Sequence, residues 1–363
     1  MITLFYFLIT IGIIVFIHEL GHFLAAKAVG IRVERFSIGY PPRIYGRQYG
    51  DTDYCISAIP LGGYVKMSGM IDESLGGEEK LTGAPHEFMS KKTWEKTLVI
   101  TAGVLMNFVL AFAIFSFLAG VQGIPTAALP VVNEVVAGSP AEQAGLRPAD
   151  RIVSIDGTPV ETWEQLVGII QKNPDRSLVV RWTRADAEMQ ATVVPRSEES
   201  KVDGQVKQVG KIGIAMGPYY KFEPVGPGGA LKAGWEMTIG GGALVVKSLW
   251  RAVTSFSMKE IGGPIAIANA SREAAKAGAL YLLNLIGMLS LSIGLLNLLP
   301  IPALDGGHLV IVLVEGISRR KLGDKVKIAI QQVGMVLLLL LMAGVIVKDI
   351  IHFGVWDKIR GLF

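Results

Sequence analysis

Residues 13–26 read IIVFIHELGHFLAA, an apolar run interrupted by His18, Glu19 and His22. The chain before these residues is equally apolar, because residues 1–17 contain no Asp, Glu, Lys or Arg. An ionisable side chain inside a membrane span is costly and usually serves a function. The stretch therefore predicts a first membrane-spanning helix over residues 1–26 that carries a functional site.

The composition of the whole chain favours a membrane protein. Of its 363 residues, 51% are hydrophobic and 18% are charged, with a mean hydropathy of +0.46, whereas soluble domains carry about 25% charged residues. Residues 1–17 lack the basic region and cleavage site of a signal peptide, so we expect a permanent span. Three further charge-free runs reach the roughly 20 residues that a span needs: 98–121, 277–304 and 328–347. We expect an α-helical polytopic membrane protein with transmembrane helices at 1–26, 98–121, 277–305 and 328–351.

Basic residues near the ends of these spans predict the orientation. Ten Lys and Arg residues lie in the loop 27–97 and five in the loop 306–327. Since cytoplasmic loops carry the excess of Lys and Arg, we expect both loops in the cytoplasm and both termini outside it. Residues 128–217 and 218–276 then lie outside as well. The formal charge of +4 needs no nucleic-acid partner, and the single cysteine, Cys55, excludes an intramolecular disulfide.

The two histidines are spaced to share one metal ion. Residues four apart lie on one face of a helix, so His18 and His22 can bind the same ion. A catalytic zinc has three protein ligands and one open position, and Asp305 is the best candidate for the third. It follows Pro300 and Pro302, which break a helix, and an irregular backbone at membrane depth must line a polar cavity. The predicted topology puts all three ligands near the cytoplasmic face.

Glu19 completes an H-E-x-x-H pattern, which is typical of zinc proteases. Zinc lowers the pKa of a bound water to about 7, and Glu19 would accept its proton and pass it to the leaving amine. The pattern thus favours peptide hydrolysis at membrane depth. The other histidines, His86, His308 and His352, are expected to be structural or solvated.

These motifs resemble the site-2 protease family of intramembrane zinc metalloproteases, and within it the bacterial RseP-type enzymes. The resemblance covers nearly the whole chain and rests on these segments: His18-Glu-Leu-Gly-His22, Pro60-Leu-Gly-Gly-Tyr-Val-Lys-Met67, Gly103-Val-Leu-Met-Asn107, Gly262-Gly-Pro264 and Asn297-Leu-Leu-Pro-Ile-Pro-Ala-Leu-Asp305-Gly306.

The resemblance implies a site and a substrate class. It makes His18, His22 and Asp305 the ligands of one Zn²⁺, Glu19 the catalytic base, and Asn297 a contact for the substrate or the transition-state oxygen. Asn107 would only pack or bond near the core. Such enzymes of the bacterial inner membrane cleave transmembrane segments of single-span proteins in regulated intramembrane proteolysis. Their substrates are anti-sigma-factor type proteins after prior trimming, or remnant signal peptides.

The cytoplasmic loop 27–97 contains a predicted β-hairpin over residues 54–67, with its turn at Pro60-Leu-Gly-Gly63. The resemblance implies that this hairpin re-enters the membrane, where its edge could pair with an extended substrate. An ordinary surface hairpin is the alternative. Residues 88–96 favour a short interfacial helix with Phe88 and Trp94 on one side, and residues 71–85 favour a mobile loop. The expected substrate contacts are Ile59, Pro60, Leu61, Gly62 and Gly63.

Residues 128–217 resemble a PDZ domain, an α/β module inserted into the membrane protein. The resemblance rests on Ser139-Pro-Ala141, in which Ser139 can cap a helix that starts at Pro140, and on Asp150-Arg-Ile152. Ala149 stands where such domains usually have glycine, so the local turn is in question. The domain could bind a peptide or trimmed substrate terminus by strand addition, or it could act as a size filter. Residues 218–276 favour amphipathic helices on the outer face, with a break at 262–264.

Two other function classes remain open from the residues alone. One is an intramembrane metal transporter that uses His and Asp ligands, and the other is a catalytically inactive PDZ scaffold. A general base beside the ligands and an outer PDZ domain are not needed for transport. An intact set of ligands and base is not needed for a scaffold. We therefore expect a zinc metalloendopeptidase whose partners are single-span substrates and the lipid bilayer.

Overall fold

A computed structural model of the chain describes residues 2–70, 82–202, 205–217, 219–254, 262–320 and 322–353. The mobile loop expected over 71–85 falls mostly outside these residues. The chain divides into two compact units, which are described separately. One comprises residues 1–118 and 231–363, and the other comprises residues 119–230.

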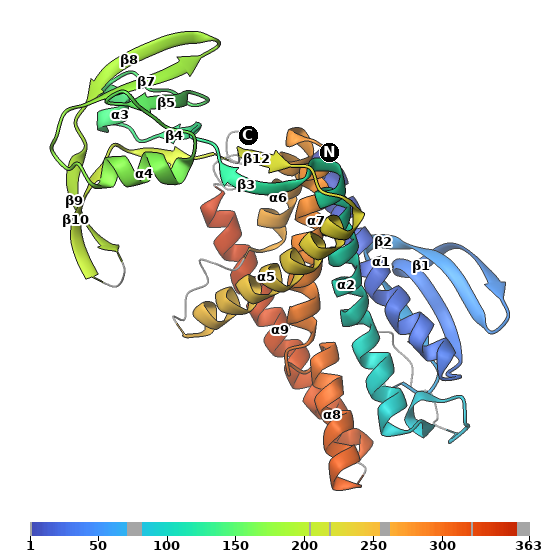
Figure 1. Cartoon of the computed structure of the whole chain (residues 1–363). Coiled ribbons are helices and arrows are strands. Elements are labelled where there is room, and N and C mark those ends of the chain that lie inside the picture. The colour runs from blue at the N-terminus through green and yellow to red at the C-terminus, as the bar shows by residue number, and fades with distance from the viewer. Residues whose placement is uncertain are drawn as a thin grey trace, which may run out of the picture. The chain divides into compact units, whose positions relative to one another are not determined.

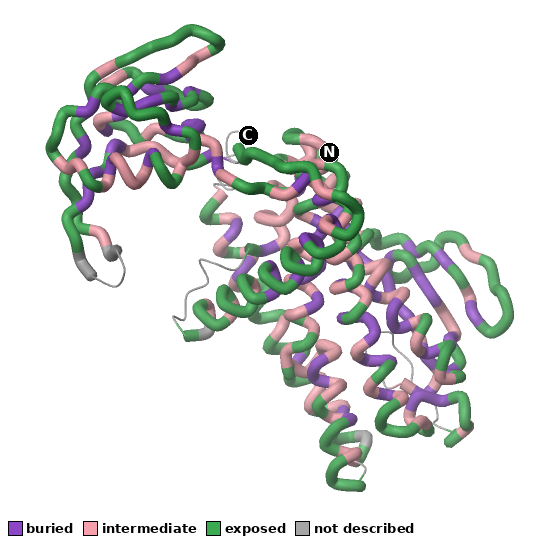
Figure 2. Tube along the Cα trace, viewed as in Figure 1, coloured by how far each residue is buried: buried purple, intermediate pink, exposed green. Residues whose placement is uncertain are grey.

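In the part of the chain that the structure describes, four helices are long and apolar enough to cross a membrane, as the sequence predicts. Each of these helices exposes large apolar side chains, and α9, for example, exposes Val333, Val336, Leu337, Leu339 and Leu340. In Figure 2 much of this helix is green or pink, which fits a surface that faces lipid. The four helices are α1 (Ile2–Ala28), α2 (Thr93–Gln122), α7 (Ala279–Asn297) and α9 (Asp324–His352).

Small residues let α1, α2 and α7 pack closely, as is common between membrane helices. A Cβ atom on Gly21 of α1 would collide with the carbonyl oxygen of Ala102 on α2. On α7, a Cβ atom at Gly287 would lie 2.7 Å from the ring of Phe115, and Ser290 donates a hydrogen bond of 2.9 Å to the carbonyl of Asn107. These contacts bring the histidine face of α1 against α2 and the end of α7.

Within the described residues, α5, α6 and α8 are further helices of this unit (Figure 1). Gly241 of α5 packs against Leu291 of α7. Helix α6 contacts α1, α7 and α9, and its start confirms the predicted break at Gly262-Gly-Pro264. The bounds are α5 (Pro227–Thr254), α6 (Pro264–Ala277) and α8 (Asp305–Ser318).

The third span is shorter than the expected 277–305. Helix α7 ends at Asn297, because Pro300 and Pro302 lack the N–H groups that would continue it. The chain then turns through Ala303, at φ +76°, and a new helix begins at Asp305. The expected loop 306–327 therefore contains α8, whose apolar stretch is too short to span a bilayer.

The loop predicted to lie in the cytoplasm forms the antiparallel strands β1 (Val33–Tyr49) and β2 (Thr52–Met67). Their pairing corrects the expected hairpin over 54–67. Residues 53–56 and 63–67 pair with the same run of β1, residues 33–38, and the tight turn lies at Gly50-Asp51 instead of 60–63. The first part of β1 is therefore a central strand with one half of β2 on each side.

The expected interfacial helix over 88–96 is not a separate element. Residues 88–90 form the short 3₁₀ helix η2 (Phe88–Ser90), and α2 already begins at Thr93. Phe88 is buried whereas Trp94 is 60% exposed, so the two aromatic rings do not share one face. The sequence pattern was wrong here because Phe88 packs into the core between α1, β2 and α2.

The second unit combines helices and strands, as the α/β module predicted over residues 128–217 requires. Strands β6, β5, β7 and β8 form one sheet in that order, and β11 pairs with β4. Ser139 caps α3 and Pro140 opens it, as predicted. Ala149 adopts φ +72°, which explains why glycine is usual there.

The helices of the second unit are α3 (Pro140–Gln143) and α4 (Trp163–Gln171). The strands before α4 are β3 (Ile124–Ala128), β4 (Val132–Val135), β5 (Arg151–Ile155) and β6 (Thr158–Pro159). Those after it are β7 (Leu178–Arg184), β8 (Ala187–Val193), β9 (Arg196–Val202), β10 (Gln205–Lys211), β11 (Ile214–Met216) and β12 (Tyr220–Glu223).

Candidate metal centre

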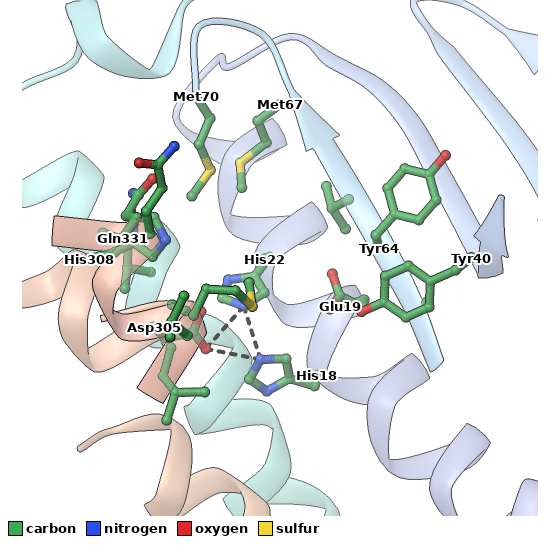
Figure 3. Close-up of a pocket in the computed structure, with 18 residues that line it drawn as sticks. His18, Glu19, His22, Tyr40, Tyr64, Met67, Met70, Asp305, His308 and Gln331 are labelled. Carbon is green, nitrogen blue, oxygen red and sulfur yellow. Dashed lines mark hydrogen bonds and ion pairs between the residues drawn. The ribbon is translucent and has the colours of Figure 1, made fainter. Parts of the chain in front are cut away.

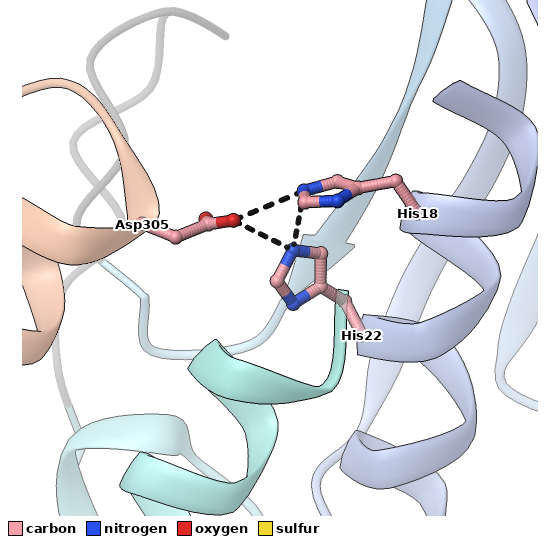
Figure 4. A group of neighbouring side chains, drawn as sticks. All are labelled: His18, His22 and Asp305. Atoms are coloured by element: carbon pink, nitrogen blue, oxygen red, sulfur yellow. Dashed lines mark hydrogen bonds and ion pairs between the residues drawn. The ribbon is translucent and has the colours of Figure 1, made fainter. Parts of the chain in front are cut away.

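Three side chains from two distant segments converge at one point (Figure 4). The Nε2 atoms of His18 and His22 lie 3.1 Å apart. The Oδ2 atom of Asp305 lies 3.0 Å from Nε2 of His18 and 3.5 Å from Nε2 of His22. Both histidines are buried, at 6% and 8% exposure. The structure thus brings together the three residues that the sequence predicts as metal ligands.

The donor set and its spacing fit zinc. Two imidazole nitrogens and one carboxylate oxygen form a common set for a catalytic zinc, with one position left for water or substrate. Ligands about 2.0–2.1 Å from a tetrahedral ion lie about 3.3 Å from one another, close to the three separations found here. The Oδ2 atom of Asp305 is buried and, among the described residues, accepts no hydrogen bond other than from the two imidazoles, if these are protonated. A cation at this point would satisfy it.

His22 is held in the orientation that a metal ligand needs. Its Nδ1 atom lies 2.8 Å from the carbonyl oxygen of Val99 on α2. Because a carbonyl can only accept, Nδ1 carries the proton and the lone pair of Nε2 faces Asp305. Gly103, one turn further along α2, makes this contact possible, since a Cβ atom there would collide with His22 Nε2 and lie 2.8 Å from His18 Cε1.

His18 is held by an asparagine side chain. The amide of Asn107 lies 3.3 Å from His18 Nδ1, and its Oδ1 atom is buried without a hydrogen-bond partner among the described residues. When Nε2 of His18 binds a metal ion, Nδ1 carries the proton and must donate it. The structure places the Nδ2 atom of Asn107 toward the ring, and with the amide turned by about 180° its Oδ1 atom would accept that bond. The contact agrees with the packing or bonding near the core expected of Asn107, and it gives Asn107 the position of a group that orients His18.

Asn297 reaches the same point from the end of α7. Its Nδ2 atom lies 3.3 Å from Nε2 of His18. The break after Asn297 lets the chain fold back, so Gly306 packs against the carbonyl of Leu299 and Gly334 of α9 packs against Pro302. A Cβ atom would collide at either glycine. These contacts position Asp305 opposite the histidines.

Glu19 lies beside the three ligands and faces strand β2 (Figure 3). The backbone N–H of Val65 on β2 donates a hydrogen bond to its carboxylate, and a Cβ atom at Gly63 would lie 3.7 Å from its Cγ. Glu19 shares a cavity of about 650 Å³ with the ligands, and the cavity is also lined by Tyr40, Tyr64, Met67, Met70, Gln331 and Met335. The pocket therefore combines a candidate base with the candidate metal ligands.

Of the predicted hairpin contacts, Gly63 reaches this cavity. Among the described residues that line it, Ile59, Pro60 and Gly62 do not appear, and the side chain of Leu61 is outside the described part. Gly62 adopts φ +146°. A Cβ atom at this position would lie 3.3 Å from the ring of Tyr40, so the missing side chain leaves room for that ring. The wall facing Glu19 is thus residues 63–67 of β2.

An aromatic and ionic network stiffens this wall. Tyr40 stacks on Tyr64 with ring centroids 6.1 Å apart, and Arg35 donates to the Tyr64 hydroxyl at 3.1 Å. Asp53 accepts hydrogen bonds from both Arg43 and Arg35. The bond from Arg43, together with the charges of the two arginines, lowers the pKa of Asp53 below its ordinary value. The carboxylate of Asp53, which links β2 to the two arginines of β1, therefore stays ionised at neutral pH.

His308 lines the cavity without belonging to the group of described residues that could hold a metal, so it is not a ligand candidate, as expected. Its Nδ1 atom lies 3.2 Å from the amide nitrogen of Gln331 on α9. It follows Asp305 by three residues, which puts both on one face of α8. Among the described residues, the group that could hold a metal contains neither His86 nor His352.

Comparisons with known proteins identify the family of this chain. The model of peptidase family M50 matches residues 6–341. A protein of Rhizobium meliloti (strain 1021) is 36% identical over 98% of this chain and 96% of its own length. The zinc metalloprotease RasP of Geobacillus kaustophilus is 29% identical over 96% of this chain and 97% of its own length. The PDZ domain of the SdrC-like protein from Listeria monocytogenes aligns with 26% of this chain and 90% of its own at 20% identity, with a TM-score of 0.21, too low to argue the fold.

The family match covers the segments that supply His18, Glu19, His22 and Asp305. It favours the protease over the metal transporter and the inactive scaffold. The chain belongs to peptidase family M50, the site-2 protease family of zinc metalloproteases.

Proposed function

We propose that this protein is an intramembrane endopeptidase that cleaves the transmembrane segments of single-span proteins. The observation that carries the proposal is the convergence of His18, His22 and Asp305 beside Glu19, on helices long and apolar enough to cross a bilayer. A hydrolytic site built into a membrane span can reach a peptide bond that soluble proteases cannot.

Each residue of the site would have its own role in the hydrolysis of a peptide bond. His18, His22 and Asp305 would hold zinc, which supplies a water of lowered pKa and polarises the substrate carbonyl. Glu19 accepts the proton of the attacking water and delivers it to the leaving amine. Its bond from the Val65 N–H supports this role, because it fixes the carboxylate between the hairpin and the metal ligands. The Asn297 amide can donate to the substrate carbonyl oxygen as its negative charge develops.

Residues 63–67 of β2 are well suited to hold the substrate. A helical substrate hides its peptide bonds, so the segment must become extended before hydrolysis. These residues pair with β1 on one side, and the Val65 N–H on their other side points to Glu19. A substrate strand added at this edge would pass along the cavity with its backbone next to Glu19.

The orientation and biology follow from the charge pattern and the family resemblance. We place the active site near the cytoplasmic face of the bacterial inner membrane and both termini outside the cytoplasm. The substrates would be anti-sigma-factor type proteins after prior trimming, or remnant signal peptides, as in regulated intramembrane proteolysis. The PDZ domain would bind a trimmed terminus or exclude intact outer domains.

Paired measurements of cleavage and zinc content test the proposal. A tagged single-span substrate is co-expressed with the wild type, Glu19→Gln or Asp305→Asn, and each purified protein is analysed for zinc. We expect Glu19→Gln to keep its zinc but to lose at least about 100-fold in cleavage rate, the range for a lost general base. Asp305→Asn should lose both zinc and cleavage.

Two matched controls lie on the exposed surface of the PDZ unit. Glu188→Gln and Asp186→Asn make the same chemical changes away from the cavity and should behave as wild type. Cleavage retained by Glu19→Gln would remove Glu19 as the base. Zinc retained in full by Asp305→Asn would mean that another residue is the third ligand.

A further inference from the structure

The two ends of the PDZ insert are joined as a two-stranded ribbon at the end of the second span. Strand β3 pairs antiparallel with β12, and Phe222 faces Pro125 across the ribbon. Helix α2 ends at Gln122, and Gly123, at φ +91°, packs so closely on the carbonyl of Glu223 that a Cβ atom would collide. The ribbon and the last turn of α2 belong to one compact unit. The ribbon therefore follows the last turn of α2 after a single residue, Gly123.

The ribbon has one aromatic face and one charged face. Tyr220 and Phe222 alternate along β12 with Lys221 and Glu223, and successive strand residues point to opposite faces. The two rings meet edge to face with centroids 6.4 Å apart. They remain 39% and 41% exposed, so a substantial part of this aromatic face is accessible.

The partner strand adds no charge to the ribbon. The chain carries no Asp, Glu, Lys or Arg from Leu98 to Asn133, a stretch that runs through α2 and all of β3. A charge-free span thus continues directly into one strand of an amphipathic ribbon. Isolated two-stranded ribbons are only marginally stable in water, so a surface that takes up the aromatic face would stabilise this one.

We propose that the β3–β12 ribbon lies in the lipid–water interface at this end of the second span. Its aromatic face, Tyr220 and Phe222, contacts the boundary between headgroups and acyl chains, and Lys221 and Glu223 face water. Tyrosine prefers this depth because its ring is apolar and its hydroxyl is polar. The membrane connection of the PDZ insert is then a ribbon seated on the bilayer instead of two free linkers.

Spin-label accessibility in liposomes tests the proposal with the full-length protein. In a Cys55→Ala background, single cysteines replace Tyr220, Lys221, Phe222 or Glu223, and each nitroxide is exposed to oxygen, which partitions into lipid, and to a water-soluble nickel chelate. Val109→Cys, on the exposed surface of α2, is the lipid reference, and Glu188→Cys on β8 is the water reference. Zinc content equal to that of the parent protein checks the fold of each variant.

We expect the oxygen-to-nickel ratio at 220 and 222 to approach that at 109, and the ratio at 221 and 223 to match that at 188. Equal, water-like ratios at all four ribbon sites would overturn the proposal. So would labels at 220 and 222 that neither reagent reaches, because another protein surface would then cover the ribbon. A lipid-soluble carbene probe on the unmodified protein gives a second readout, with adducts expected on Tyr220 and Phe222 and none expected on Lys221.

Discussion

His18 and His22 sit one turn apart on α1, and each ring is held by a different group on α2. The Val99 carbonyl fixes His22 through its Nδ1 proton, and the Asn107 amide lies against Nδ1 of His18. Groups that orient a ligand in this way typically change metal affinity 10–100-fold when removed. The histidines of the H-E-x-x-H pattern therefore depend on α2 for their geometry.

Substitutions of Asn107 separate an acceptor role from simple packing. Asn107→Asp keeps an oxygen that accepts the His18 Nδ1 proton, so zinc affinity should stay near or above that of the wild type. Asn107→Leu keeps the volume but removes the acceptor, and affinity should fall about 10–100-fold. Zinc titration against a competing chelator measures both, with exposed Asn133→Leu as the control. Equal zinc affinity in the Asp and Leu variants would rule out hydrogen bonding as the function of Asn107.

Residue spacing predicted the four residues at the centre of the site, namely His18, Glu19, His22 and Asp305. It did not predict the groups on α2 that hold the two histidines in place. The interval of four residues between His18 and His22 and the proline break before Asp305 are local signals. Asn107 and Gly103 approach the histidines only because α2 packs on α1, and no local pattern marks which face of an apolar helix meets another. His308 shares a face of α8 with Asp305 and lines the cavity, but among the described residues it is not one of the candidate metal ligands.

At the scale of elements, the crossing of α1 and α2 determines whether the ligands can converge. Gly21 and Gly103 lie at this crossing, and each leaves no room for a Cβ atom. Gly103 matters more for metal binding than Gly21, because the two imidazole rings occupy the space that a side chain at position 103 would fill.

Gly103→Ala tests this close approach. The added methyl collides with the histidine rings, and overpacking of this kind costs about 1–3 kcal/mol, so we expect a roughly 10–100-fold loss of zinc affinity and a matching loss of cleavage. Gly12→Ala on α1 is the matched control, because among the described residues no atom lies within 4 Å of a Cβ built there. Zinc affinity unchanged in Gly103→Ala would show that the helices can separate without disturbing the ligands.

The elements also show where sequence reasoning fails. Apolar, charge-free runs predicted the four spans because length and hydropathy are properties of one segment. The predicted hairpin over residues 54–67 was wrong. Gly62 and Gly63 are typical turn residues, but both halves of β2 pair with residues 33–38 of β1 instead of with each other. Pairing of this kind depends on which strand lies between them, and turn residues do not encode it.

For the whole molecule, the account requires one orientation in the membrane. Cysteines introduced at exposed positions test it: Arg47→Cys lies on β1 and Lys207→Cys on β10. A membrane-impermeant thiol reagent applied from the outer side should label position 207 directly and position 47 only after the membrane is permeabilised. The native Cys55 is buried and gives the background. The reverse labelling pattern would invert the topology and move the active site to the outer face.

The central claim is hydrolysis inside the membrane by the site of His18, Glu19, His22 and Asp305. The most direct measurement reconstitutes the purified protein with a single-span substrate in proteoliposomes and maps the cut peptide bond by mass spectrometry of both products. The account predicts a cut within the substrate's apolar segment, on its cytoplasmic side, and no product with Glu19→Gln. A cut confined to the polar flanks of the substrate, or the same products from Glu19→Gln, would contradict it.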